Sequence, residues 1–219
     1  MQRRSLWVVV ACLFAVSLAA PQASAQGIKL GVKGGVNIAD FGGSDADSLG
    51  STKSKAGFVG GAFAEFMIGN MFAIQPEVLY SQKGLKAEEA GATAKLKLDY
   101  IEVPVLFKVN IPIEGSKVRP SVYAGPAVAF KASCKVSGSV GGIDVDVDCD
   151  DPLIDLPVKS TDFGVAFGGG IAFDVGGAEV GIDVRYTLGL TKIDDDPDPL
   201  DIKNRVISIM GTVGFSPNK

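Results

Sequence analysis

The chain has 219 residues, of which 47% are hydrophobic, and it contains 28 glycines and no histidine. The lack of histidine excludes mechanisms that need an imidazole base or a histidine metal ligand. Its 21 basic and 25 acidic residues give a net charge of −4, so the basic surface typical of a nucleic-acid partner is missing.

Residues 1–25 have the organisation of a secretory signal peptide. A short basic start precedes an apolar run from Leu6 to Ala20, and Ala23-Ser-Ala25 supplies a small-x-small cleavage site. The apolar run is too short to span a bilayer comfortably. We therefore predict export of the protein, with residues 26–219 forming a single β-barrel domain.

From Gly27 onward, apolar residues recur at every second position, which is the period of a β-strand with two different faces. We predict eight strands, at residues 28–38, 57–67, 72–81, 100–109, 118–131, 162–175, 179–190 and 206–215. The links between them are alternately long, at 40–56, 84–95, 132–161 and 191–205, and short, at 68–71, 110–117 and 176–178. This pattern predicts an all-β fold, an eight-stranded antiparallel up-and-down transmembrane β-barrel with short turns toward the periplasm.

The composition of the two strand faces indicates which one contacts lipid. The polar face is rich in glycine and alanine, which fits the narrow interior of an eight-stranded barrel. The apolar face carries aromatic residues near both strand ends, as the two aromatic girdles of an outer-membrane barrel require. These are Phe72, Phe107, Phe173 and Phe215 at the short-turn end, and Tyr80, Phe130 and Phe163 at the long-loop end. The alternative is a soluble, exported lipocalin-like barrel with the faces exchanged, which would bind a small apolar ligand.

Charged residues on the polar face would lie inside a lipid-embedded barrel. Isolated burial of an ion costs several kcal/mol, so these charges must find partners. We predict a lumen ion network of Glu77, Glu102, Arg119 and Arg185 that fills the interior. A narrow pore, gated by the same residues, is the alternative interpretation.

Several segments, in order along the chain, resemble the PorT-like or OmpA-like small outer-membrane β-barrel proteins. They are Gly31-Val-Lys-Gly-Gly-Val-Asn37, Gln75-Pro-Glu-Val-Leu-Tyr-Ser-Gln-Lys-Gly84, Tyr100-Ile-Glu-Val-Pro104, Tyr123-Ala-Gly-Pro126, Asp183-Val-Arg-Tyr-Thr-Leu-Gly-Leu190 and Lys203-Asn-Arg-Val206. The motifs are strand and turn signatures, so the resemblance implies fold and location rather than an activity. One departure is that Phe215 is followed by four further residues, whereas many such barrels end on an aromatic residue.

The loop between the fifth and sixth predicted strands contains Cys134 and Cys149, two cysteines in an exported chain, which points to a disulfide. Gly141-Gly142 lies midway between them and suits a two-residue hairpin turn. Folding about that turn sets Cys134 opposite Cys149 and Lys135 opposite Asp148. The sequence therefore predicts a disulfide-closed hairpin.

The same hairpin carries alternate aspartates, Asp144, Asp146 and Asp148. Their spacing is similar to the start of a calcium loop, but position six is Cys149 where an EF-hand needs glycine. The simpler interpretation is a strand with its aspartates facing water. We expect no metal centre and no cofactor, and divalent cations bound at these acidic loops are the alternative.

These observations favour an integral outer-membrane protein with a structural or surface-interaction role. A Ser-His pair is impossible, and Glu77 or Glu102 with a serine is too generic a pattern, so we expect no enzyme. The expected partners are outer-membrane lipid and the barrel-assembly machinery, and we expect a monomer.

Overall fold

The computed structural model describes residues 27–45, 52–89, 92–140, 143–149, 151–152, 157–195 and 200–216. The predicted signal peptide and the expected Gly141-Gly142 turn lie outside these ranges. Within them, no helix is long and apolar enough to cross a membrane.

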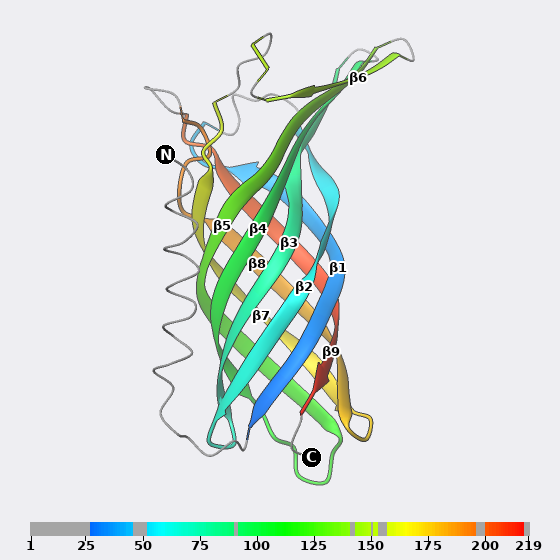
Figure 1. Cartoon of the computed structure of the whole chain (residues 1–219), viewed down its shortest axis with the longest axis vertical. Helices are drawn as coiled ribbons and strands as arrows, with labels where there is room; N and C mark the ends of the chain where they lie inside the picture. Colours follow the sequence, from blue (N-terminus) through cyan, green and yellow to red (C-terminus); the bar gives the residue numbers. More distant parts are fainter. Residues whose placement is uncertain are drawn as a thin grey trace.

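Nine strands occur in the described part of the chain, and eight of them form a closed barrel (Figure 1). Neighbours pair antiparallel in the order β4-β3-β2-β1-β9-β8-β7-β5-β6, and the pairing of β4 with β5 closes the ring. β6 pairs with the end of β5 and stays outside the ring. This confirms the predicted eight-stranded barrel. The strands are β1 (Ile28–Gly42), β2 (Thr52–Ile68), β3 (Phe72–Glu89), β4 (Ala92–Asn110), β5 (Val118–Val140), β6 (Ile143–Asp148), β7 (Thr161–Asp174), β8 (Ala178–Gly189) and β9 (Lys203–Phe215).

Several strands are longer than the sequence pattern suggested, and β3, β4 and β5 extend furthest. The expected loops at 84–95 and 132–161 are largely strand, because β3, β4 and β5 continue into them. Alternation persists there, but lysines such as Lys95 and Lys97 replace the apolar residues of the lipid-facing side. These extensions project beyond the barrel as a twisted sheet that carries β6 at its edge (Figure 1).

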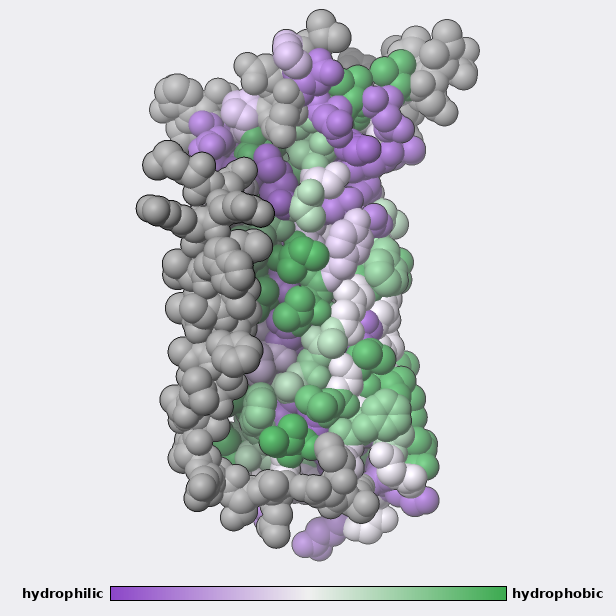
Figure 2. Space-filling model, in the orientation of Figure 1, coloured by the Kyte–Doolittle hydropathy of each residue, from purple (hydrophilic) through white to green (hydrophobic). Residues whose placement is uncertain are grey.

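The apolar strand face lies on the outside of the barrel. Side chains such as Val32, Phe72, Phe107 and Ile182 are 57 to 62% exposed, and Figure 2 shows hydrophobic residues over the barrel wall. The predicted aromatic residues of the short-turn girdle, and Phe130 and Phe163 of the other, are exposed as well. Because the polar face is turned inward, the lipocalin-like alternative, which needs an apolar interior, is not favoured.

Inward-facing side chains fill the barrel. Small apolar clusters form around Leu106 and Tyr123 and around Leu79 and Met210. A further cluster lies toward the long loops, where Leu98 and Tyr100 are fully buried against the two cysteines. The interior also contains a layer of buried polar and charged side chains.

Candidate functional site

The centre of the lumen is a charged group built on Glu77 of β3. Arg185 of β8 donates two hydrogen bonds to this carboxylate, from Nη1 to Oε2 at 2.9 Å and from Nη2 to Oε1 at 3.0 Å. Lys33 of β1 approaches Oε1 at 2.8 Å, and Gln75 donates to the same oxygen at 2.7 Å. All three charged side chains are at most 2% exposed, so the pairing takes place in a low-dielectric interior. Strands on opposite sides of the barrel are thereby joined across the lumen.

Tyr123 of β5 and Asp183 of β8 extend this group on the opposite wall. The Tyr123 hydroxyl donates to Asp183 Oδ1 at 2.7 Å and accepts from Arg185 Nε at 3.3 Å. Gly168 makes room for the tyrosine, because a Cβ there would lie 2.7 Å from the hydroxyl and 2.2 Å from the carbonyl oxygen of Val184. The Asp183 carboxylate also lies 3.8 Å from the Lys33 ammonium. Each charge at this level therefore has partners of the opposite sign.

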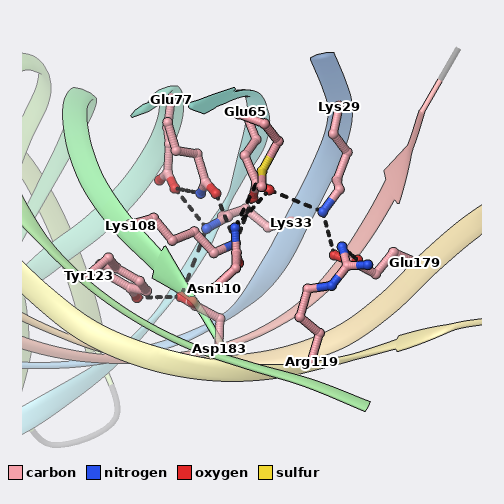
Figure 3. A network of polar contacts seen from close by, with 12 residues as sticks. Lys29, Lys33, Glu65, Glu77, Lys108, Asn110, Arg119, Tyr123, Glu179 and Asp183 are labelled. Atoms are coloured by element: carbon pink, nitrogen blue, oxygen red, sulfur yellow. Dashed lines mark hydrogen bonds and ion pairs between the residues drawn. The ribbon is translucent and has the colours of Figure 1, made fainter. Parts of the chain in front are cut away.

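A second charged level lies nearer the short turns and centres on Glu65 of β2. Its carboxylate binds Lys108 at 2.7 Å and Lys29 at 3.2 Å (Figure 3). Lys29 also pairs with Glu179 at 2.6 Å, and Arg119 binds the other oxygen of Glu179 at 2.9 Å. Lys108 donates to Gln75 as well, which links this level to Glu77. The two levels form one continuous polar network.

The four residues predicted as the lumen network point to the interior, but they do not form one contact group. Glu77 and Arg185 bind each other directly. Glu102 instead pairs with Lys83 at 2.5 Å, toward the long loops. Arg119 pairs with Glu179 at the short-turn end, where its side chain is 38% exposed. The four residues therefore make three acid–base pairings: those of Glu77 and Arg119 belong to the continuous network, and the Glu102–Lys83 pair lies apart from it.

Sequence reasoning missed the lysines that complete the lumen. Lys29, Lys33 and Lys83 are buried, and so is Glu65. Lys29 and Lys33 fall on the polar face of β1 by simple alternation, which is the signal that could have identified them. The partner of Lys33 was not readable, because Lys33 reaches Glu77 across the whole of β2.

Little free space remains at the charged levels. One cavity there has a volume of about 30 Å³ and touches Lys33, Glu65, Gln75 and Asp183. Such a volume has room for about one water molecule. Larger cavities of about 440 and 490 Å³ occur at the short-turn end, beside Arg119. Among the described residues of the two charged levels, this cavity therefore leaves room for a water molecule and for nothing as large as a substrate.

The β5–β6 hairpin is closed by a disulfide between Cys134 and Cys149. Its register pairs Val136 with Val147 and Lys135 with Asp148, as folding about the two glycines requires. The Lys135 and Asp148 side chains lie 3.9 Å apart.

Among the acidic candidates, Asp146 accepts hydrogen bonds from Ser137 and, at 3.2 Å, from Lys97. The Ser137 hydroxyl and then the Lys97 ammonium hold the pKa of Asp146 below its ordinary value. The side chain of Asp144 lies outside the described part. Among the side chains that are described, no group of three histidine, cysteine or acidic residues could hold a metal ion.

Comparison with known proteins agrees with this architecture. OprG from Pseudomonas aeruginosa shares the fold, with 12% identity, a TM-score of 0.51, and coverage of 86% of this chain and 95% of OprG. Neisserial surface protein A is 18% identical with a TM-score of 0.47, over 85% of this chain and 96% of its own. Ail from Yersinia pestis is 15% identical with a TM-score of 0.44, and the match covers 87% of this chain and 100% of Ail. No curated protein matches the sequence.

The family comparison is more specific. Residues 21–195 match the model described as outer membrane protein beta-barrel domain. That match covers most of the chain and includes all strands from β1 to β8. The chain therefore belongs to the outer membrane protein beta-barrel domain family and is an integral protein of the outer membrane.

Proposed function

We propose that this barrel is a non-conducting, non-enzymatic membrane protein that acts as a structural or surface-interaction element. The observation that carries the proposal is the Glu77–Arg185 pair, which crosses the lumen with both side chains almost completely buried. An eight-stranded barrel is wide enough only for its own side chains, so a solute path would require this pair to separate. Separation would leave two unpaired buried charges, at a cost of several kcal/mol.

The interior also gives little support to catalysis. Both carboxylate oxygens of Glu77 accept bonds from Arg185, and one of them accepts from Lys33 as well. A carboxylate held in this way by two cations is stabilised as the anion and is a poor general base. What remains available to partners is the sheet beyond the barrel, where β3 to β6 project (Figure 1).

Conductance in a planar bilayer tests the proposal. We expect the purified protein to give no stepwise current. The double variant Glu77→Ala with Arg185→Ala removes the side chains that cross the lumen, and we expect small but measurable steps from it. Wild-type steps as large as those of the double variant would contradict a closed lumen and favour the narrow pore.

We further propose that the chain is a monomer folded by the barrel-assembly machinery. Closure supports this proposal, because β1 and β9 use their edges on each other and leave no edge in the ring for a second copy. The segments Gln75–Gly84 and Asp183–Leu190 support a place among the PorT-like or OmpA-like barrels. Binding of divalent cations by the aspartates of β6 is a secondary proposal. It is secondary because Asp146 already forms an ion pair with Lys97, which a cation would have to displace.

A further inference from the structure

A cavity of about 490 Å³ lies at the short-turn end of the barrel, opposite the end from which the extended sheet projects (Figure 1). It is bounded by the first residues of β1 and β5, the last residues of β2 and β4, and two of the short turns. Its volume falls in the range of roughly 300 to 1,000 Å³ that is usual for small-molecule sites. The chemistry of its lining indicates which kind of molecule fits it.

The described residues that line this cavity supply positive charge and no carboxylate. The charged side chains are those of Lys29 and Arg119, and Asn70 and Asn110 add two carboxamide groups. Such a lining attracts an anion and disfavours a cation.

Both cations are held in place by carboxylates that they share with other cations. Lys29 binds Glu65 at 3.2 Å and Glu179 at 2.6 Å. Glu65 also binds Lys108 at 2.7 Å, and Glu179 also binds Arg119 at 2.9 Å (Figure 3). Three cations therefore share two carboxylates at this level, which leaves one positive charge in excess.

The deeper level of the lumen does not remove this excess. There, the two cations Lys33 and Arg185 face the two acids Glu77 and Asp183, so the charges are already equal in number. A negative charge that matches the excess has to come from outside the network.

The other charged groups of the short-turn end do not supply it either. The neighbouring cavity of about 440 Å³ adds one side chain of each sign, Lys117 and Asp174. Glu114 is exposed in its turn and lines neither of the two cavities. Beyond the described ends, Gln26 and residues 217–219 contain no acidic side chain.

Arg119 presents the unmatched charge to the cavity. Its side chain is 38% exposed, whereas that of Lys29 is 7% exposed. A guanidinium has five N–H donors, and toward the described side chains Arg119 uses only Nη1, which donates to Glu179. Arginine binds carboxylates through two parallel hydrogen bonds. The remaining donors of Arg119 therefore suit a second carboxylate, which binds without displacing Glu179.

The rest of the lining indicates the body of the molecule that carries this carboxylate. Met67 and Pro112 give the cavity apolar surface beside the polar groups. A short hydrocarbon chain suits such a surface better than a second charged group does.

We propose that this cavity binds a small organic acid, with its carboxylate on Arg119 and Lys29 and a short apolar body beside Met67 and Pro112. The bound carboxylate supplies the negative charge that the network lacks, in the way that Glu179 already bridges the same two cations. This site goes beyond the surface-interaction role and does not rest on it, because it lies at the other end of the barrel.

Titration of the folded protein with butyrate in an uncharged detergent tests this proposal, with NMR of the backbone amides at Gly69 and Asn70 as the readout. Butyramide has the same shape without the charge, and inorganic phosphate is a second anion. Arg119→Gln removes the guanidinium. Lys117→Gln makes the same charge change outside the cavity and is the matched control. Slower migration on SDS gels after boiling reports whether each variant is folded.

We expect wild type to bind butyrate at least about tenfold more tightly than butyramide, because a hydrogen bond to a charged group contributes this much. Arg119→Gln should bind butyrate roughly tenfold more weakly for the same reason. Lys117→Gln should stay within about twofold of wild type. Equal binding of butyrate and butyramide, an equal loss in Lys117→Gln, or tighter binding of phosphate than of butyrate would overturn the proposal.

A second pair of variants predicts a gain of binding. Glu179→Gln frees Lys29 and Arg119 from a competing carboxylate, so it should bind butyrate at least about threefold more tightly. Glu114→Gln makes the same charge change in an exposed turn and should stay within about twofold of wild type. Weaker binding by folded Glu179→Gln, or an equal gain in Glu114→Gln, would also overturn the proposal. None of these outcomes depends on conductance or on the projecting sheet, so the two proposals fail separately.

Discussion

At the scale of single residues, the lumen is organised around carboxylates that each hold more than one cation. Glu77 binds Arg185 and Lys33, and Glu65 binds Lys29 and Lys108. Replacing such a group does not simply remove one favourable contact. It leaves the partner charges buried without compensation, which is the expensive state.

We predict that Glu77→Ala destabilises the barrel by about 3–5 kcal/mol, because Arg185 and Lys33 then lose their principal partner. Urea unfolding in lipid vesicles, followed by the gel shift between folded and unfolded forms, measures the change. Glu114→Ala, in an exposed turn, is the control and should cost less than about 0.5 kcal/mol. Equal stability of the two variants would show that the central network is energetically unimportant.

Gly168 supports a second prediction at this scale. A methyl group there meets the Val184 carbonyl and the Tyr123 hydroxyl, so Gly168→Ala should cost about 1–3 kcal/mol through backbone displacement. At Gly34 the nearest atom to an added Cβ is 3.7 Å away, so Gly34→Ala should be close to neutral. The same unfolding assay compares them, and a Gly168 variant as stable as the Gly34 variant would contradict the close fit.

At the scale of elements, the disulfide and the hairpin act locally. The disulfide closes a 15-residue separation, which corresponds to roughly 3 kcal/mol of loop entropy. We predict that Cys134→Ser with Cys149→Ser makes β6 sensitive to limited proteolysis while the barrel stays folded on unboiled gels. An unfolded barrel in this variant would mean that the hairpin is required for closure.

The hairpin also has a predictable pH dependence through Asp146. Its folded pKa lies below its unfolded value of about 3.9, so its stabilising contribution is present above that pH. The contribution is lost as the pH falls through the folded pKa. An NMR titration of the carboxyl carbon should give a midpoint below 3.9 that rises in Ser137→Ala, and an unchanged midpoint would contradict the assigned hydrogen bond.

Most elements could be predicted from the sequence because alternation is a local signal. The hairpin register followed from two cysteines placed symmetrically about Gly141-Gly142, and the barrel strands followed from the apolar face. The strand extensions could not be predicted, because Lys95 and Lys97 interrupt the apolar pattern that marked a strand. The Lys33–Glu77 pair could not be predicted either, because these residues belong to strands that are not neighbours.

At the scale of the whole molecule, the barrel is a polar core inside an apolar wall. Apolar side chains that face lipid cost no free energy by being exposed there. The stability of the barrel therefore comes from the closed ring of backbone hydrogen bonds and from the paired charges inside the lumen. The closed ring supplies the first through the β1–β9 and β4–β5 pairings. The network from Glu65 to Arg185 supplies the second. The barrel has short turns at one end and an extended sheet at the long-loop end, and this asymmetry is the reason why we propose that partners bind at the long-loop end.

The measurement that tests this account most directly is heat-modifiability of the protein in isolated outer membranes. We predict that it is extracted only with detergent and that its unboiled band runs ahead of the boiled one on an SDS gel. A closed, lipid-embedded barrel gives this result because it resists SDS until heated. Recovery in the soluble periplasmic fraction, with one mobility in both conditions, would contradict the outward-facing apolar wall on which the account depends.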